Sequence, residues 1–253
     1  MKKIIKSIFA VFNIAVRSKS KLDKKLSNSV SIQKWRHDIE FTLRIGSHLG
    51  PDFLKYIQLS KSQFRQDLFA LKELKLKKNG FFVEFGATDG VSGSNTFLLE
   101  KEFGYKGILA EPNPKQRKNI STVRDAIIVE ECVWTKSGEK LDFVDDGDLS
   151  TVNIFKKPEN KKSSFTVNTI SLTDMLDKYN APKLIDYLSI DTEGSEYDIL
   201  SNHNFSKYNF SVITVEHNFT KQRDKILNLL SEKGYKRKYE KLSMQDDWYI
   251  FMK

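Results

Sequence analysis

Cysteine and long apolar runs are almost absent from this chain of 253 residues. Cys132 is its single cysteine, which excludes an internal disulfide and favours a reducing compartment, so we expect a cytoplasmic protein. Because no cysteine–histidine cluster accompanies Cys132, a structural zinc site is not indicated. The longest strongly apolar run is about half the roughly 20 residues that a membrane-spanning helix needs.

Acidic residues are scarce in the first segment of the chain. Residues 1–30 contain eight lysines and arginines against Asp23 alone, whereas the whole chain has a net charge of +9. Apolar side chains such as Ile4, Ile8 and Phe12 share one helical face of this segment. We expect residues 1–30 to make a peripheral contact with an anionic membrane; the alternatives are packing on the protein body, a frayed tail, or a signal peptide without an A-x-A site. Since the remaining chain is nearly neutral, a nucleic-acid partner is not favoured.

The next segment has the periodicity of helices. Trp35, Ile39 and Leu43 fall in one row at four-residue spacing, and Gly50-Pro51 ends the run. A further helix is expected from an N-cap at Ser62 to the Asn79-Gly80 stop. We therefore predict a basic, helical extension over residues 1–60 and one large domain over residues 61–253.

From Phe81 onward, apolar strands alternate with helices, and this alternation predicts an α/β fold with a doubly wound, mostly parallel sheet. A closing pair of strands, 235–239 and 248–252, predicts an antiparallel hairpin at the C-terminus. We also expect a strand over 140–144 and an edge strand over 165–170, with a polar loop from Asp145 to Lys162 between them. The predicted strands are 81–85, 107–111, 126–133, 140–144, 165–170, 184–190 and 210–215.

Acidic residues recur where these strands end, at Glu84, Asp89, Glu111, Asp191 with Glu193, and Glu216. The carboxyl ends of parallel strands meet at one edge of a sheet, so we expect these side chains to line one pocket.

The turn after the first strand, Gly86-Ala87-Thr88-Asp89-Gly90, allows close approach of a ligand but is not G-x-G-x-x-G. Its carboxylate would repel phosphate and attract a cation, which favours a sulfonium cofactor over NAD. Glu111 lies where the acid that binds ribose hydroxyls lies in dinucleotide folds.

Several ordered motifs resemble the FkbM family of S-adenosylmethionine-dependent methyltransferases, over about Ser62 to Met252. They are Ser62–Asp67, Val83–Gly90, Ser94–Thr96, Gly107–Pro114, Ser189–Glu196 and Val215–Asn218, with Thr88 where the family often has asparagine. The resemblance implies a class I methyltransferase fold, with Glu84, Gly86 and Asp89 around the methionine part of S-adenosylmethionine and Glu111 on the ribose. Asn113 and Cys132 would lie near adenosine. The full set of implied cofactor contacts is Glu84, Gly86, Ala87, Asp89, Gly90, Asn95, Thr96, Glu111, Pro112, Asn113, Cys132, Asp191 and Glu193.

Known members often methylate hydroxyls on natural products or on sugars of glycans, so we expect O-methylation of a sugar, a glycan or a lipid-linked saccharide. A hydroxyl acceptor benefits from a general base. His217 is the first choice, oriented by Glu216 or Asp191, and Asp191 is the alternative base. A divalent metal held by Asp191, Glu216 and His217 stays open, although no short metal motif supports it. An NAD-dependent oxidoreductase and an RNA methyltransferase are the competing functions.

Overall fold

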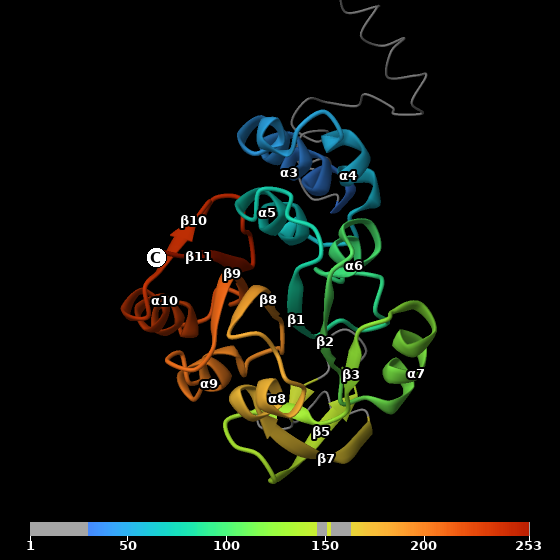
Figure 1. Ribbon diagram of the computed structural model, residues 1–253, viewed down its shortest axis with the longest axis vertical. Helices are drawn as coiled ribbons and strands as arrows, with labels where there is room; N and C mark the ends of the chain where they lie inside the picture. The colour runs from blue at the N-terminus through green and yellow to red at the C-terminus, as the bar shows by residue number, and fades with distance from the viewer. Residues whose placement is uncertain (1–29, 146–150, 153–162, 253) are drawn as a thin grey trace, which may run out of the picture. The chain divides into compact units, whose positions relative to one another are not determined.

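The computed structural model describes residues 30–145, 151–152 and 163–252 (Figure 1). The chain divides into two compact units, Met1–Arg44 and Ile45–Lys253, so the division falls before the predicted boundary at residue 60. The expected membrane-binding segment and most of the polar loop that follows Asp145, including Ser150 and Asn153, lie outside the described residues.

The described part of the first unit is helix α3 (Val30–Arg44), which confirms the helical prediction there. Its predicted apolar row is at the surface, because Trp35, Ile39 and Leu43 are 72%, 56% and 79% exposed. The buried side chains, His37 and Phe41, lie on the other side of the helix. Among the described residues, we find no helix with the length and apolarity of a membrane span.

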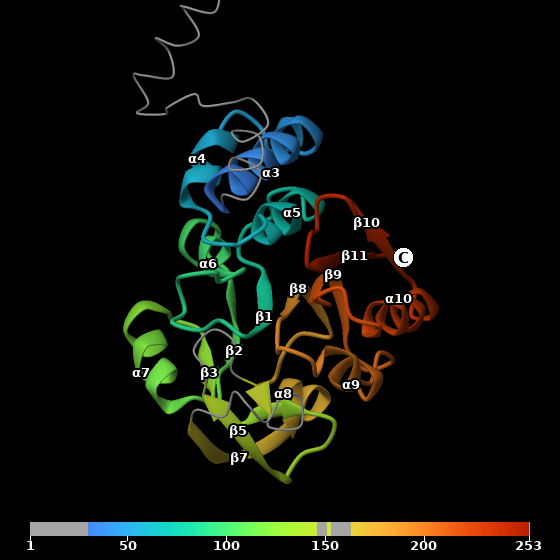
Figure 2. The same ribbon diagram turned by 180° about the vertical axis from the view of Figure 1, so that it is seen from behind.

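The second unit is built on a seven-stranded sheet of order β10-β11-β9-β8-β1-β2-β3 (Figures 1 and 2). Neighbouring strands are parallel except that β11 runs antiparallel to both β10 and β9. The prediction of a doubly wound sheet with a C-terminal antiparallel hairpin is therefore confirmed. The strands are β1 (Phe81–Phe85), β2 (Lys106–Ala110), β3 (Ile127–Val129), β8 (Leu184–Ile190), β9 (Asn209–Glu216), β10 (Tyr235–Lys238) and β11 (Asp246–Phe251).

Close packing fixes the centre of this sheet. β1 lies between β2 and β8, and Phe82, Val83 and Phe85 are buried. Gly107 of β2 lies against the ring of Phe82, where an added Cβ would come within 2.4 Å of the ring. A larger residue at position 107 would therefore displace the central strand.

Helices flank the sheet in the order in which the chain visits it. In both views α7 accompanies β3, while α9 and α10 accompany β9 and the hairpin (Figures 1 and 2). The remaining helices of this unit precede β1 or connect the other strands. The helices are η1 (Gly46–Leu49), α4 (Phe53–Leu59), α5 (Gln66–Glu73), α6 (Phe97–Phe103), α7 (Pro114–Val123), α8 (Leu172–Lys178), α9 (Glu196–Ser201) and α10 (Gln222–Glu232).

Two local predictions are wrong in detail. The helix expected from Ser62 begins at Gln66, since Arg65 before it has a left-handed φ of 66°. The strand expected over 126–133 is two strands, β3 and β4 (Cys132–Trp134), which belong to different sheets.

The second sheet has four strands in the order β4-β7-β5-β6. Besides β4 it contains β5 (Lys140–Asp145), β6 (Thr151–Val152) and β7 (Ser163–Ser171). β7 was expected at an edge, but it lies between β4 and β5, parallel to the first and antiparallel to the second. Phe143, Val152 and Val167 pack with Cys132 and Trp134 in a small apolar cluster on this sheet, which explains why a sequence read as one sheet forms two.

Candidate active site

The glycine turn and the end of β8 are in direct contact at the carboxyl edge of the seven-stranded sheet. Gly86 has φ +83°, and a Cβ added there would lie 2.0 Å from the backbone oxygen of Asp191. Only glycine fits this position, both for its conformation and for its space. The structure thus brings together two predicted site residues that are 105 positions apart.

Glu84 of β1 is buried, and its carboxylate is already occupied. It accepts hydrogen bonds from the Asn95 amide (2.6 Å), the Ser94 hydroxyl (2.9 Å) and the Thr96 hydroxyl (2.5 Å). Within the described structure, Glu84 and Thr96 therefore hold the loop that follows the glycine turn. Their predicted contact with a cofactor stays a prediction.

Arg124, which follows α7, was not among the predicted residues, although it connects most of this region. Its side chain is fully buried and donates to the Gly90 carbonyl (2.9 Å), the Ser94 hydroxyl (3.0 Å) and the Thr96 hydroxyl (2.8 Å). It also pairs with Glu100 of α6 at 3.0 Å. No local motif marks this arginine, because its partners lie 24 to 34 residues earlier in the chain.

The turn itself is held by Asp89. The carboxylate accepts the amide hydrogens of Val91 (2.8 Å) and Ser92 (2.7 Å), and the Gly90 amide donates to the Ala87 carbonyl at 2.7 Å. Burial alone would raise the pKa of Asp89, but these hydrogen bonds outweigh it, so the pKa lies below its ordinary value. Asp89 is therefore ionised at neutral pH.

Glu111 follows β2, buried beside the predicted adenosine residues. One carboxylate oxygen accepts the backbone amide hydrogen of Asn113 at 2.8 Å, and no hydrogen bond from a described residue reaches the other oxygen. Burial raises the pKa of Glu111 to about 7 and that of the Cys132 thiol to about 12, with Glu111 adding to the second effect. The structure therefore places Glu111 and Cys132 near one another.

Asn113 and Pro112 also make local contacts. The Asn113 side chain caps α7 by accepting the Lys115 amide at 3.0 Å, and the Pro112 carbonyl accepts from Arg117 at 2.6 Å. Asn95, in contrast, points across the sheet edge and donates to the Ser189 hydroxyl of β8 at 2.9 Å. Its buried side-chain oxygen has no hydrogen-bond partner among the residues that the structure describes, so it is available to a ligand donor.

Three carboxylates gather where β8 and β9 end. Ligand atoms of Asp191, Glu193 and Glu216 all lie within 4.8 Å of one another. Glu193 has a left-handed φ of 58°, and Glu196 of α9 supports this turn by accepting the amides of Thr192 and Gly194. The expected convergence of these acids is therefore present.

Burial and mutual repulsion disfavour the ionised forms of two of these carboxyl groups. The pKa of Asp191 lies well above its ordinary value, because the group is buried and faces Glu216 and Asp246. Burial, with the charge of Glu193, raises the pKa of Glu216 to about 8, while a hydrogen bond to Asp191 works in the other direction. Asp191 and Glu216 thus share a proton at neutral pH.

Asp246, at the start of β11, is a further carboxyl group near this cluster that the sequence did not indicate. Gln66 donates to it at 2.7 Å, and burial raises its pKa to about 7. Gln66 belongs to the Ser62–Asp67 segment that carried part of the family resemblance. That segment therefore reaches the site through α5.

His217 is buried against a different carboxylate from the one expected. Its Nδ1 accepts the Phe219 amide at 3.0 Å, and its Nε2 lies 3.8 Å from Asp247, which Arg223 and Arg237 also contact. Burial lowers the pKa of His217, so the ring is neutral. Because Nδ1 uses the lone pair of the neutral ring, Nε2 carries the proton.

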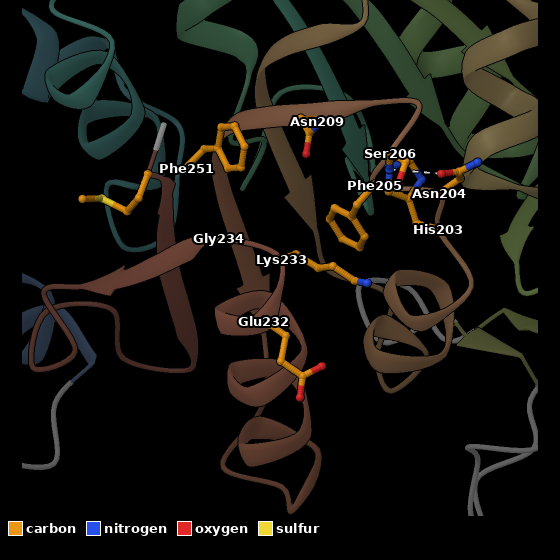
Figure 3. A pocket seen from close by; sticks show the side chains of 10 residues that line it. His203, Asn204, Phe205, Ser206, Asn209, Glu232, Lys233, Gly234 and Phe251 are labelled. Carbon is orange, nitrogen blue, oxygen red and sulfur yellow. Dashed lines mark hydrogen bonds between the residues drawn. The ribbon is translucent and has the colours of Figure 1, made fainter.

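A hollow of about 530 Å³ lies at the opposite edge of the sheet, where β9 and β10 begin (Figure 3). Phe205, Asn209, Lys233 and Phe251 are among the residues that line it. None of its lining residues is a predicted site residue. The acids of the glycine turn and of the β8 and β9 ends thus belong to a separate place on the molecule.

Comparison with protein families gives a match to the methyltransferase FkbM domain over residues 84–237, more than half of the chain. This range contains the glycine turn, Glu111 and the Asp191–Glu216 pair. The curated proteins contain no match.

Solved structures with likeness to this chain include several methyltransferases of low identity. A methyltransferase FkbM from Methylobacillus flagellatus is 14% identical, with a TM-score of 0.44, and the match covers 88% of this chain and 62% of that protein. A precorrin-6y C5,15-methyltransferase from Geobacter metallireducens is 16% identical, with a TM-score of 0.41, and the match covers 73% of this chain and 85% of that one. A TehB-like methyltransferase from Corynebacterium glutamicum is 8% identical, with a TM-score of 0.40 and coverage of 82% and 98%.

The described residues fit S-adenosylmethionine. Gly86 leaves no room for a side chain beside Asp191. Glu111 has a carboxylate oxygen to which no described residue donates, and this oxygen could accept a hydrogen bond from a ribose hydroxyl. The unpartnered oxygen of Asn95 is a buried acceptor at the same edge of the sheet. With the family match over this region, NAD is no longer a competing cofactor, and the chain belongs to the FkbM family of S-adenosylmethionine-dependent methyltransferases.

Proposed function

We propose that this enzyme methylates a hydroxyl group of a sugar, on a glycan or a lipid-linked saccharide, with the Asp191–Glu216 pair as the general base. The observation that carries the proposal is the raised pKa of both carboxyl groups, hydrogen-bonded to one another beside Gly86. A proton acceptor with a pKa near the working pH is the kind that assists transfer from a hydroxyl group.

The cofactor-binding residues proposed here are those at the ends of β1 and β2. Glu111 would bind the ribose, with Asn113 and Cys132 toward the adenine, and the turn from Gly86 to Gly90 would face the methionine part. The ionised Asp89 supports a cationic ligand at this turn. Its two carboxylate oxygens differ, because the backbone amides engage one of them.

Bound S-adenosylmethionine supplies a methyl group on a sulfonium, which is a good leaving group. The protein's own part is to hold the acceptor hydroxyl in line and to remove its proton. As the new O–CH₃ bond forms and the S–CH₃ bond breaks, the hydroxyl proton passes to the ionised member of the Asp191–Glu216 pair. Positioning contributes up to roughly 7–11 kcal/mol in favourable cases, and a base about 10²–10⁴-fold.

The contacts of His217 favour a supporting role for this residue. Its Nδ1 is engaged by the Phe219 amide and its Nε2 faces Asp247, so neither nitrogen presents a lone pair to an acceptor. We therefore place the carboxylate pair before His217 as the base, which reverses the order expected from the sequence.

A divalent metal at Asp191, Glu193 and Glu216 is the alternative use of the same carboxylates. His217 does not belong to this group, in contrast to the expected set. Methyl transfer that stops on chelation and returns with Mg²⁺ would favour the metal over the base.

The sugar acceptor and the membrane contact of residues 1–30 support one another, because lipid-linked saccharides are assembled at membranes. An RNA acceptor is less suited, since residues 45–253 have a net charge of only +1.

The test is methyl transfer by the purified protein from S-adenosylmethionine labelled in its methyl group. Oligosaccharides and a lipid-linked saccharide extract from the source cells are offered as acceptors, with total RNA in parallel, and the products are analysed by mass spectrometry. We expect label on a saccharide oxygen and none on RNA. Labelling of RNA alone, with saccharides unchanged, would refute the proposed acceptor while leaving the family assignment intact.

A further inference from the structure

Helix α3 has apolar side chains on two opposite sides, and only one of them is covered. His37 and Phe41 are buried on one side. Trp35, Ile39 and Leu43 form a row on the other side, at 72%, 56% and 79% exposure. The packed side of the helix therefore does not include Trp35, Ile39 and Leu43, which lie at the surface. We call these three residues the α3 row.

The unit that contains the α3 row also contains nearly all of the net charge. Residues 1–44 have eleven lysines and arginines against three aspartates and glutamates, a net +8 of the chain's +9. Within α3, Lys34, Arg36 and Arg44 are exposed, whereas Asp38 and Glu40 are partly buried. The described surface of the helix thus presents positive charge around the apolar row.

We infer that α3 binds an anionic lipid surface with the α3 row inserted at the headgroup boundary. Trp35 is suited to this position, because indole rings concentrate at membrane interfaces. Ile39 and Leu43 would supply buried apolar area, and the exposed bases the attraction to anionic headgroups. The inference extends the proposed contact of residues 1–30 to a folded helix, and it does not depend on which molecule the enzyme methylates.

The experiment uses the full-length protein and vesicles of phosphatidylcholine with or without phosphatidylglycerol. Trp134 and Trp248 are buried, at 9% and 0% exposure, so a change in tryptophan emission on binding reports Trp35. We expect binding to the anionic vesicles only, a blue shift of the emission, and quenching by brominated lipid.

The decisive variant is Ile39→Glu with Leu43→Glu, which should weaken vesicle binding about tenfold or more, since two apolar side chains no longer insert. Met252→Glu is the matched control, because Met252 is an apolar residue of the other unit at 53% exposure. Circular dichroism and binding of S-adenosylhomocysteine check that both variants are folded.

Several outcomes would overturn the inference. Vesicle binding of the double variant equal to that of the wild type, or binding without a change in Trp35 emission, would assign the contact to residues 1–29 alone. Absence of wild-type binding to anionic vesicles would exclude the lipid surface. A dimer in sedimentation that the double variant abolishes, with no vesicle binding, would instead make the row an interface between two copies. None of these results bears on methyl transfer, which is measured separately.

Discussion

The carboxylates around β1 and those at the ends of β8 and β9 lie at the same edge of the sheet, yet they meet different neighbours. Glu84 and Asp89 accept hydrogen bonds from hydroxyls and backbone amides, and Arg124 lies within 3.9 Å of Glu84. Asp191 and Glu216 mainly meet one another and further acids. Asp89 is therefore held in the charged form, whereas the Asp191–Glu216 pair holds a proton.

In the proposed mechanism, this difference assigns donor binding to the carboxylates around β1 and proton removal to those at the ends of β8 and β9. A fixed negative charge suits the binding of a cationic donor, and it must not change during the reaction. A group that is easily protonated suits the removal of a proton from the acceptor. Residue type alone does not distinguish Glu84 and Asp89 from Asp191 and Glu216, since each pair is one glutamate and one aspartate.

The largest effect is expected from replacing one member of the Asp191–Glu216 pair. Asp191→Asn should lower kcat by about 10²–10⁴-fold, since the amide cannot receive a proton. The affinity for S-adenosylhomocysteine, measured by calorimetry, should change little. Glu232→Gln is the control, because Glu232 is an exposed carboxylate of α10 outside the cluster, and it should retain the wild-type rate. Equal rates in Asp191→Asn and wild type would remove the pair from the mechanism.

The next largest effect is expected from replacing Arg124, which contacts the residues around β1. Arg124→Met should lower the free energy of unfolding by about 3–5 kcal/mol, because Glu84 and Glu100 would stay buried without the guanidinium, and Glu100 would keep only the partly exposed Lys101 as a charged partner. Denaturant titration measures this change. Arg124→Lys should recover only part of the stability, since an ammonium group cannot bridge four acceptors as the guanidinium does.

Lys101→Met supplies the control for this experiment. Lys101 also pairs with Glu100, at 3.0 Å, but its side chain is 34% exposed. A surface pair of this kind is worth about 0–1 kcal/mol. A loss of stability in Arg124→Met no larger than that in Lys101→Met would show that the buried network does not hold the glycine turn.

For the region around β1, the sequence predicts which residues are present but not which of them contact one another. Buried strands and their glycine turns are local patterns, so β1, its turn, α6 and the position of Glu111 are predictable. Arg124 is not, because its value comes from acceptors at Gly90, Ser94 and Glu100 that only the folded chain brings together.

For Asp191 and Glu216, the sequence predicts that the two residues lie close together but not their protonation. The convergence of Asp191 and Glu216 follows from their places at the ends of adjacent parallel strands. Their shared proton does not, since it depends on burial and on Asp246 from β11. The interpretation of His217 as the base failed to anticipate Asp247, which lies thirty residues later and is its carboxylate neighbour.

A change of pH should sharpen the comparison by acting on one region only. The pKa of Glu216 is raised from 4.5 to about 8, so the folded state binds a proton that the unfolded state has released. Its contribution to stability is therefore present below pH 4.5 and is lost as the pH rises toward 8. The rate should change in the opposite direction, because the fraction of Glu216 that is ionised and able to accept the hydroxyl proton increases with pH, and kcat should rise to a plateau above pH 8.

Thermal unfolding and single-turnover rates across this range measure both trends, and Glu216→Gln should flatten them. Asp89 offers the contrast, because its pKa is lowered and its proton is lost well below this window. A wild-type rate that is independent of pH between 5 and 9 would contradict the shared proton.

The smallest expected effect concerns Glu111. Its pKa of about 7 lies between the lowered pKa of Asp89 and the pKa of about 8 of Glu216. Glu111→Gln keeps an acceptor for the Asn113 amide but replaces one carboxylate oxygen by a donor, so it removes one of the hydrogen bonds proposed for a ribose diol. We expect about tenfold weaker binding of S-adenosylhomocysteine, equivalent to the loss of roughly one hydrogen bond, with kcat at saturation almost unchanged. Glu130→Gln, at a side chain that is 76% exposed, is the control and should bind normally. An unchanged affinity in Glu111→Gln would mean that the buried carboxylate serves α7 and the Cys132 side of the fold, and that the ribose is bound elsewhere along the edge.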